Sequence, residues 1–281
     1  MGPIPASPGY PMAVGPHPHT GIHTVTWLLE GALLHRDSLG SEQVVRPGEL
    51  NVMTAGGAVS HAEEPVDGYS GGLHGIQLWV AQPEVTRHGE AGFEHHAALP
   101  EIDLAHGRAS VLVGSVDGVV SPAVHDTPSV GVDLEVRAGV VTVPLEPMFE
   151  HCMVVLEGSA VVDGQVVAPG ALAYLGLGRD ELTVASNGSA RLLVLGGEPF
   201  ESPLVMWWNF VGRSRQEMVE AVTAWNAGAD RFGETGSSMA RIPAPVPPWS
   251  TERPESASSD QGAATGDDRP SDDEESPTDT V

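Results

Sequence analysis

The feature that most constrains the fold is an internal repeat of one strand-and-turn pattern. The segments WLLEGALLHRDSLGSEQVVRPGELNVM and MVVLEGSAVVDGQVVAPGALAYL both contain a strand, a Glu-Gly turn, a strand, a Pro-Gly turn and a strand. The Glu-Gly turn at 30–31 matches the one at 157–158, and the Pro-Gly turn at 47–48 matches the one at 169–170. Two copies of one β unit in a chain of 281 residues predict two similar barrels in tandem.

Short apolar runs separated by turn residues fill the rest of the folded part. Runs such as HTVTWLLEG, HGIQLWVAQP and ASVLVGSVDG are rich in Val, Thr and Ile and are typical of strands. One helix is expected near residues 214–226, where Ser214 and Glu217 form a capping box and apolar residues follow at helical spacing. The chain is therefore predicted to be all-β with one short C-terminal helix.

Four regions are predicted along the chain. Residues 1–118 form the N-terminal barrel, and residues 119–235 form the C-terminal barrel and end in the helix. Residues 236–249 are rich in proline and are expected to form a linker or a strap on the domain surface. Residues 250–281 hold ten acidic residues, two arginines and no aromatic residue, which predicts a disordered acidic tail.

Charge and composition exclude several classes of partner. The chain has 38 acidic residues against 13 basic ones, a formal net charge of −25, so electrostatically driven binding to nucleic acid is not expected. No apolar run approaches the ~20 residues of a membrane span. The start MGPIPASPGYP has no signal-peptide pattern, so a cytoplasmic protein is expected. The single cysteine, Cys152, excludes an internal disulfide and a multi-cysteine metal site.

Two pairs of polar residues in the first repeat have the spacing of metal ligands. His17 and His19 precede a strand, and His61 and Glu63 end another. Because residues i and i+2 of an extended segment face the same way, each pair can direct both side chains into one barrel. Three imidazoles and one carboxylate suit a divalent first-row metal, and Fe, Mn, Ni, Cu and Zn all remain open on ligand type.

The second repeat serves as an internal control for this site. Aligned on its turns, it has Pro144, Glu146, Thr183 and Ala185 where the four ligands stand in the first repeat. The second barrel is therefore predicted to lack metal ligands. Confinement of the ligands to one repeat is expected if they serve a site and not the fold.

Four segments resemble the pirin family of the cupin superfamily: HPHTGIHTVTWLLEG, LHRDSLGSE, RPGELNVMTAGGAVSHAEEP and HGIQLWV. The resemblance extends to about residue 235 and is densest over residues 15–80. It implies a bicupin, that is, two tandem cupin (double-stranded β-helix, or jelly-roll) barrels, with one mononuclear metal in the N-terminal barrel. The metal is usually iron in this family, so Fe²⁺ is expected. Carried over by position, its ligands are His17, His19, His61 and Glu63.

Several positions need separate predictions. His23 departs from the usual pirin residue. It is expected to be a pocket residue near the metal or a histidine tilted outward, rather than a fifth ligand. Gln77 and Trp79 alternate on one strand and either face the metal pocket or pack as half-buried strand residues. His35 is expected to anchor a turn with Asp37. Pirins normally begin further upstream, so the N-terminal barrel is expected to lack some strands unless the start codon was assigned too late.

The resemblance implies a metal-dependent dioxygenase that opens flavonols such as quercetin, with dioxygen as the second substrate. Glu63 is then expected to be both a metal ligand and the catalytic base that accepts the phenolic proton. The alternative is a non-catalytic metal-binding regulatory protein that acts through a protein partner. A cupin retained only for its fold is a third interpretation. The first two interpretations use the same set of ligands.

Overall fold

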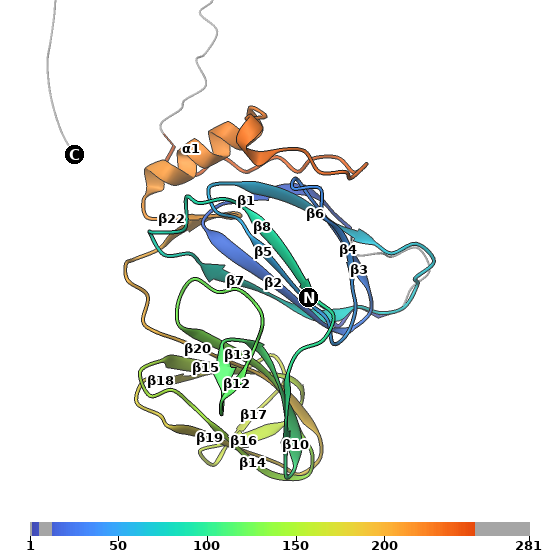
Figure 1. Ribbon diagram of the computed structural model, residues 1–281, viewed down its shortest axis with the longest axis vertical. Helices are drawn as coiled ribbons and strands as arrows, with labels where there is room; N and C mark the ends of the chain where they lie inside the picture. Colours follow the sequence, from blue (N-terminus) through green and yellow to red (C-terminus); the bar gives the residue numbers. More distant parts are fainter. Residues whose placement is uncertain (1, 6–12, 251–281) are drawn as a thin grey trace, which may run out of the picture. The chain divides into compact units, whose positions relative to one another are not determined.

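The computed structural model describes residues 2–5 and 13–250, which contain many strands and one α-helix (Figure 1). The strands of the first barrel are β1 (Val14–His19), β2 (Ile22–Glu30), β3 (Leu33–Asp37), β4 (Glu42–Val45), β5 (Leu50–Thr54), β6 (Val59–Pro65), β7 (His74–Ala81) and β8 (Gly92–His96). They form two four-stranded antiparallel sheets with the orders β1-β6-β3-β4 and β7-β2-β5-β8. These two sheets face each other as in a jelly roll.

The second barrel repeats this plan with a larger sheet. Its strands are β9 (Glu101–Leu104), β10 (Gly107–Val113), β13 (Ser129–Val136), β14 (Gly139–Pro144), β15 (Glu150–Gly158), β16 (Ala160–Val162), β17 (Gln165–Val167), β18 (Leu172–Gly176), β19 (Glu181–Ser186) and β20 (Ala190–Gly197). The sheets have the orders β18-β15-β20-β13-β10-β9 and β14-β19-β16-β17. Two small hairpins pair β11 (Ser115–Val116) with β12 (Val119–Val120) and β21 (Val205–Trp207) with β22 (Phe210–Gly212).

The repeat seen in the sequence matches the repeat in the fold. The Glu-Gly turns follow β2 in the first barrel and end β15 in the second, and the Pro-Gly turns precede β5 and β18. Gly31, Gly48, Gly158 and Gly170 all have positive φ angles, a conformation that glycine adopts without the steric cost of a side chain. The prediction of an all-β chain built from two similar barrels is confirmed.

The predicted boundary at residue 118 differs from the strand pairing. Strands β9 and β10, which that boundary assigns to the first barrel, pair with each other, and β10 also pairs with β13 in the sheet of the second barrel. Sequence patterns do not report which sheet a strand joins. The two barrels belong to one compact unit, residues 1–249, so the residue numbers of the boundary stay a prediction.

The two faces of strand β2 have different surroundings. Val25 and Trp27 lie in a buried cluster that also contains Leu112 and Leu193 of the second barrel. Thr24 and Thr26 point to the opposite face, because side chains alternate along a strand. Gln77 on β7 lies across from Thr26 and reaches Glu63 on the opposing sheet. The inner face of this sheet therefore lines the barrel, and the outer face packs on the second barrel.

A buried ion pair of the second barrel lies at the same contact and is hydrogen-bonded to the first barrel. The Asp133 side chain on β13 is 2% exposed. It accepts hydrogen bonds from Arg191 Nε on β20, at 3.0 Å to Oδ1, and from Trp27 Nε1 on β2, at 2.8 Å to Oδ2. The carboxylate thus joins one strand of the first barrel to two strands of the second.

The helix α1 (Arg215–Asn226) begins at the predicted capping box and is followed by the short 3₁₀ helix η1 (Asp230–Phe232). Ser214 Oγ accepts a hydrogen bond from the backbone N–H of Glu217 at 3.2 Å. Met218, Val222 and Trp225 are buried, as the helical spacing requires. None of the described helices has the length and apolar character needed to cross a membrane.

Residues 236–249 lie along α1 and β1, so of the two expected forms they take the form of a strap. Trp225 Nε1 donates a hydrogen bond to Ile242 O at 2.8 Å, and Asn226 exchanges two hydrogen bonds with Ala244. The Ile242 N–H donates to Pro16 O on β1 at 2.9 Å. The predicted disordered tail, residues 250–281, falls outside the described residues except for Ser250.

Candidate metal centre

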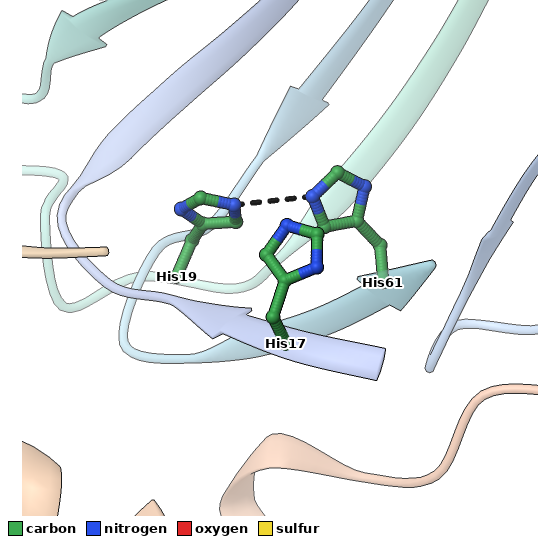
Figure 2. Close-up of side chains that lie close together, drawn as sticks. All are labelled: His17, His19 and His61. Atoms are coloured by element: carbon green, nitrogen blue, oxygen red, sulfur yellow. Dashed lines mark hydrogen bonds between the residues drawn. The ribbon is translucent and has the colours of Figure 1, made fainter. Parts of the chain in front are cut away.

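Three imidazoles of the first barrel converge on one point (Figure 2). His17 and His19 come from β1 and His61 comes from β6, and the register of the two strands sets His17 directly opposite His61. One ring nitrogen from each residue can be chosen so that the three atoms lie within 4.8 Å of one another. The Nε2 atoms of His19 and His61 are 3.1 Å apart. His19 and His61 are each 1% exposed, so the cluster is buried.

The local sequence explains why β1 can present two ligands side by side. The His-Pro-His order sets both imidazoles on one face of an extended strand. Pro18 between them lacks an N–H, which a strand tolerates at the edge of a sheet, and β1 is an edge strand. The alternation of His61 and Glu63 on β6 places both side chains on the face that carries the cluster.

Hydrogen bonds to the backbone and to side chains determine which ring nitrogens are free. His17 Nδ1 lies 2.9 Å from Gly15 O, and since a carbonyl only accepts, His17 carries its proton on Nδ1. Its Nε2 therefore keeps a lone pair. His61 Nδ1 lies 3.3 Å from His35 Nδ1, which leaves His61 Nε2 directed at His19.

Burial keeps these imidazoles neutral. It lowers the pKa of His17 and lowers the pKa values of His19 and His61 well below the usual value, and the neighbouring His17 pushes the latter two in the same direction. A neutral imidazole offers the lone pair that a metal ion needs, whereas a protonated one repels the ion. The cluster is therefore suited to bind a metal without first losing protons to solvent.

Glu63 lies two residues beyond His61 on β6 and is 3% exposed. Gln77 Nε2 on β7 donates a hydrogen bond to Glu63 Oε1. Burial raises the pKa of Glu63 to about 7, and the hydrogen bond from Gln77 opposes this rise. The group of mutually close ligand atoms contains the three histidines without Glu63, so its part as fourth ligand stays a prediction.

Gln77 and Trp79 both face the candidate site. Gln77 contacts Glu63, and the Trp79 ring lies edge-on to the His19 ring with the centroids 5.2 Å apart. Trp79 is 39% exposed, so one part of its ring contacts the buried cluster and another part contacts solvent. Of the two arrangements that the sequence left open, these contacts are those of pocket-facing residues.

His23 lies elsewhere. Its Nδ1 is 2.9 Å from Thr54 Oγ1, and its Nε2 is 3.1 Å from Asp126 Oδ2, on the loop before β13. In one continuous strand, a residue four positions after His19 would share its face. The turn at Gly21, with a φ of +67°, interrupts the strand between His19 and His23. His23 shares its face of β2 with Val25, and these contacts give it no place beside the ligands.

Sequence reasoning missed one member of the site, His35. The predicted contact with Asp37 is confirmed, with His35 Nε2 3.2 Å from Asp37 Oδ2. The contact of His35 Nδ1 with His61 was not predicted. A signal was present, since His35 and Asp37 have the same alternation as His61 and Glu63, but only the register of β3 on β6 sets the two pairs side by side.

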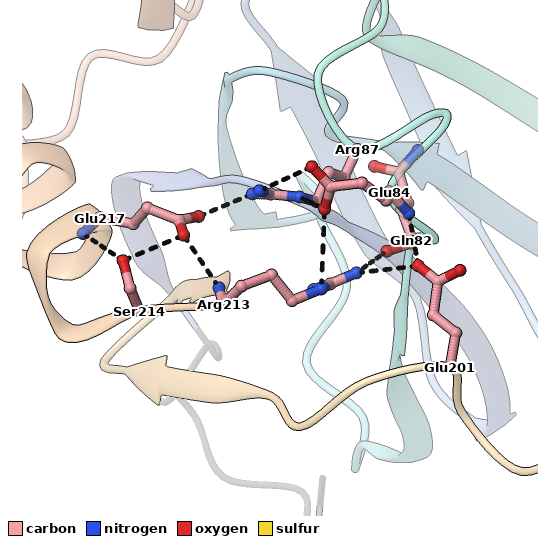
Figure 3. Close-up of polar contacts among 7 residues, drawn as sticks. All are labelled: Gln82, Glu84, Arg87, Glu201, Arg213, Ser214 and Glu217. Atoms are coloured by element: carbon pink, nitrogen blue, oxygen red, sulfur yellow. Dashed lines mark hydrogen bonds and ion pairs between the residues drawn. The ribbon is translucent and has the colours of Figure 1, made fainter.

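A second polar network holds the loop that follows β7, the strand that carries Gln77 and Trp79 (Figure 3). Arg87 donates hydrogen bonds to Glu84 in the same loop and, at 2.7 Å, to Glu217 of α1. Arg213 Nη2 donates to Gln82 O at 2.8 Å and lies 3.7 Å from Glu201. The network ties α1 to the first barrel and has structural partners for each of its charges.

The second barrel has an apolar core. Met153, Val155, Leu182 and Val184 belong to its buried core. Among the residues that the structure describes, the three histidines of the first barrel form the single group of three or more potential ligands that are mutually close.

Two family models match this chain. The pirin family model matches residues 3–80, and the model of the pirin C-terminal cupin domain matches residues 131–233. Together they match more than half of the chain. The chain belongs to the pirin family. Its two barrels are tandem cupin domains, as the resemblance implied.

Relatives of this pirin carry names that refer to quercetin. It is 42% identical over 252 residues to a Pseudomonas aeruginosa protein named "Putative quercetin 2,3-dioxygenase", with 88% of this chain and 79% of that protein covered. It is 34% identical over 235 residues to a pirin-like protein of Caulobacter vibrioides, with 81% of each chain covered.

Solved structures include similar folds. The crystal structure of a quercetin 2,3-dioxygenase from Acinetobacter baumannii has a TM-score of 0.85 and 39% identity, with 89% of this chain and 84% of that chain covered. A bacterial pirin from Escherichia coli in complex with nickel(II) has a TM-score of 0.55 and 18% identity over 66% of this chain and 77% of that chain, a likeness that concerns the fold alone.

The raised pKa of Glu63 predicts how stability depends on pH in this pirin. In the metal-free protein the folded state holds a proton on Glu63 up to a pKa of about 7, whereas the unfolded state releases it near 4.5. The free energy of unfolding should therefore fall between pH 4.5 and 7 because of this group. Glu63→Gln removes the effect, and its stability relative to the unsubstituted protein should rise by on the order of 3 kcal/mol from pH 4.5 to pH 8.

Urea unfolding of the metal-free protein across this pH range measures the difference. The exposed Glu90→Gln variant is the matched control and should show no such trend. Parallel pH profiles for Glu63→Gln and the unsubstituted protein would contradict the burial argument.

Proposed function

We propose that this pirin is a metal-dependent dioxygenase that opens the ring of a flavonol such as quercetin. The observation that carries the proposal is the meeting of three buried, neutral imidazoles in a barrel that also buries a carboxyl group with a pKa of about 7. The names of relatives that are 42% and 39% identical to this chain support the reaction type. Quercetin as the substrate rests on those names.

The residues proposed to hold the metal are His17, His19 and His61, with Glu63 as the fourth ligand. Their donor set, three imidazole nitrogens and one carboxylate oxygen, fits Fe²⁺, which we propose, and would also accept Ni, Mn, Cu or Zn. Bound Fe²⁺ would supply Lewis acidity toward the substrate hydroxyl and redox chemistry toward dioxygen. The burial of His19, His61 and Glu63 limits the access of bulk water to this chemistry.

Glu63 is proposed to accept the proton of the flavonol hydroxyl. Gln77 occupies Oε1 of the carboxylate, so Oε2 is the oxygen left to take the proton. In the metal-free protein burial raises the pKa of Glu63 to about 7, which favours proton uptake by this carboxylate. Gln77 also prevents the carboxylate from rotating away from this position.

Trp79 is proposed to guide the aromatic substrate. Its ring contacts His19 on one side and is 39% exposed, so it joins the buried site to the surface. A flat indole edge or face offers the offset or edge-to-face contacts that flavonol rings prefer.

The test is turnover by protein of known metal content. Protein loaded separately with Fe²⁺, Ni²⁺, Mn²⁺, Cu²⁺ and Zn²⁺ is analysed for bound metal and then supplied with a panel of flavonols and dioxygen. We expect oxygen uptake with a ring-opened product, and we expect Glu63→Gln to lower kcat by at least ~100-fold, the low end for loss of a general base. Glu90→Gln is the control with unchanged turnover. Protein that holds one metal per chain and consumes no oxygen with any flavonol would refute the proposed activity.

A further inference from the structure

We propose that Asp37 and His35 are positioning residues that fix the tautomer and the ring orientation of His61, so that His61 Nε2 presents a lone pair to the metal centre. The consequence for metal binding rests on the proposed function. The tautomer itself is a property of the metal-free chain.

The three side chains form one continuous series of hydrogen bonds with a single consistent direction. Asp37 Oδ2 is 3.2 Å from His35 Nε2, and an ionised carboxylate only accepts, so His35 carries its proton on Nε2. In a neutral His35 ring, Nδ1 is then an acceptor. It lies 3.3 Å from His61 Nδ1, which must therefore carry the proton and leave Nε2 free.

Packing prevents the two positioning residues from leaving these positions. The His35 ring stacks on Phe93 with the centroids 4.5 Å apart and the planes 15° apart. Asp37 is 1% exposed, and its Oδ1 accepts hydrogen bonds from the backbone N–H groups of Leu39 and Ser41, both at 2.9 Å. The tight turn after β3 thus orients Oδ2 toward His35.

The register of the sheet places this series beside the ligands. On β6, His61 is paired with His17 on one side and with Asp37 on the other. One row across three strands therefore contains His17, His61 and Asp37, and the Asp37 carboxylate acts on His61 through His35. Groups that orient a ligating imidazole in this way commonly change metal affinity about 10- to 100-fold when they are removed.

Asp37→Asn tests the direction of the series without changing its shape. The asparagine Oδ1 can still accept from the two backbone N–H groups, but its Nδ2 can only donate to His35. His35 must then accept at Nε2 and carry its proton on Nδ1. His61 Nδ1 becomes the acceptor, and its proton moves to Nε2, the atom meant for the metal.

Two measurements follow from this reversal. Nitrogen-15 NMR of the metal-free protein should show the His61 proton on Nδ1 in the unsubstituted chain and on Nε2 in Asp37→Asn. Competition between the protein and a chelator for Fe²⁺ or Zn²⁺ should show affinity about 10- to 100-fold weaker in Asp37→Asn.

A matched control comes from a second Asp–His pair among the described residues, Asp126 with His23, whose contacts lie outside the cluster. Asp126→Asn should leave the His61 tautomer and the metal affinity unchanged. At position 35, glutamine can accept from His61 and donate to Asp37, so His35→Gln should keep most of the affinity, whereas His35→Leu should lose as much as Asp37→Asn. The two His35 variants keep the test decisive if Asp37→Asn folds poorly.

The proposal is overturned if the unsubstituted protein carries the His61 proton on Nε2, or if both Asp37→Asn and His35→Leu bind metal as tightly as it does. Failure of the proposed function has a different signature. Absence of oxygen uptake by the metal-loaded protein would refute the dioxygenase while the tautomer and affinity results remained as expected.

Discussion

His61→Ala is expected to abolish stable metal binding. Among the three histidines it is the one contributed by β6, and its Nε2 lies 3.1 Å from His19 Nε2. Its removal leaves two imidazoles from β1 and the carboxylate of Glu63. It also removes the Nδ1–H group that donates to His35 Nδ1. Since loss of a residue that merely orients a ligand costs about 10- to 100-fold in affinity, loss of the ligand itself should exceed 100-fold.

Metal analysis after dialysis against a weak chelator measures this loss directly. His151→Ala is the matched control, because His151 is also a strand histidine, is 1% exposed, and lies in the second barrel. It should bind metal as the unsubstituted protein does. A His61→Ala protein that retained one metal per chain at the original affinity would show that the ion binds elsewhere.

Arg191→Met is expected to produce the largest loss of stability. The substitution keeps most of the side-chain volume but leaves the Asp133 carboxylate, 2% exposed, with the Trp27 indole N–H as its remaining side-chain donor. Breaking a buried pair in this way costs about 3 to 5 kcal/mol, because an uncompensated charge stays in the interior. Urea unfolding followed by tryptophan fluorescence should show a correspondingly lower free energy of unfolding.

Arg108 offers the comparison for Arg191, since it pairs with Glu101 and Glu135 on the surface and its side chain is 43% exposed. Arg108→Met should cost at most about 1 kcal/mol. Adding Asp133→Leu to Arg191→Met should restore part of the lost stability, because the buried charge is then gone. Equal losses of unfolding free energy in Arg191→Met and Arg108→Met would contradict the assignment of Asp133 as a buried charge that requires its partner.

Sequence patterns predicted what depends on neighbours along the chain. The two turns of each repeat, the cap at Ser214 and the His-x-His and His-x-Glu alternations are local, and the structure contains each of them. Contacts that depend on long-range register were not predictable. His35 reaches His61 because β3 pairs with β6, and His23 turns away because one glycine with a positive φ separates two strands.

The prolines of β1 have a further consequence for the molecule in its metal-free form. An edge strand usually presents free N–H groups that can recruit a strand from another chain. Pro16 and Pro18 have none to present, and the carbonyl of Pro16 is already bonded to Ile242 of the strap. The strand that carries two of the three histidines is thereby a poor template for intermolecular β-pairing. The metal-free chain is therefore expected to resist aggregation through this strand.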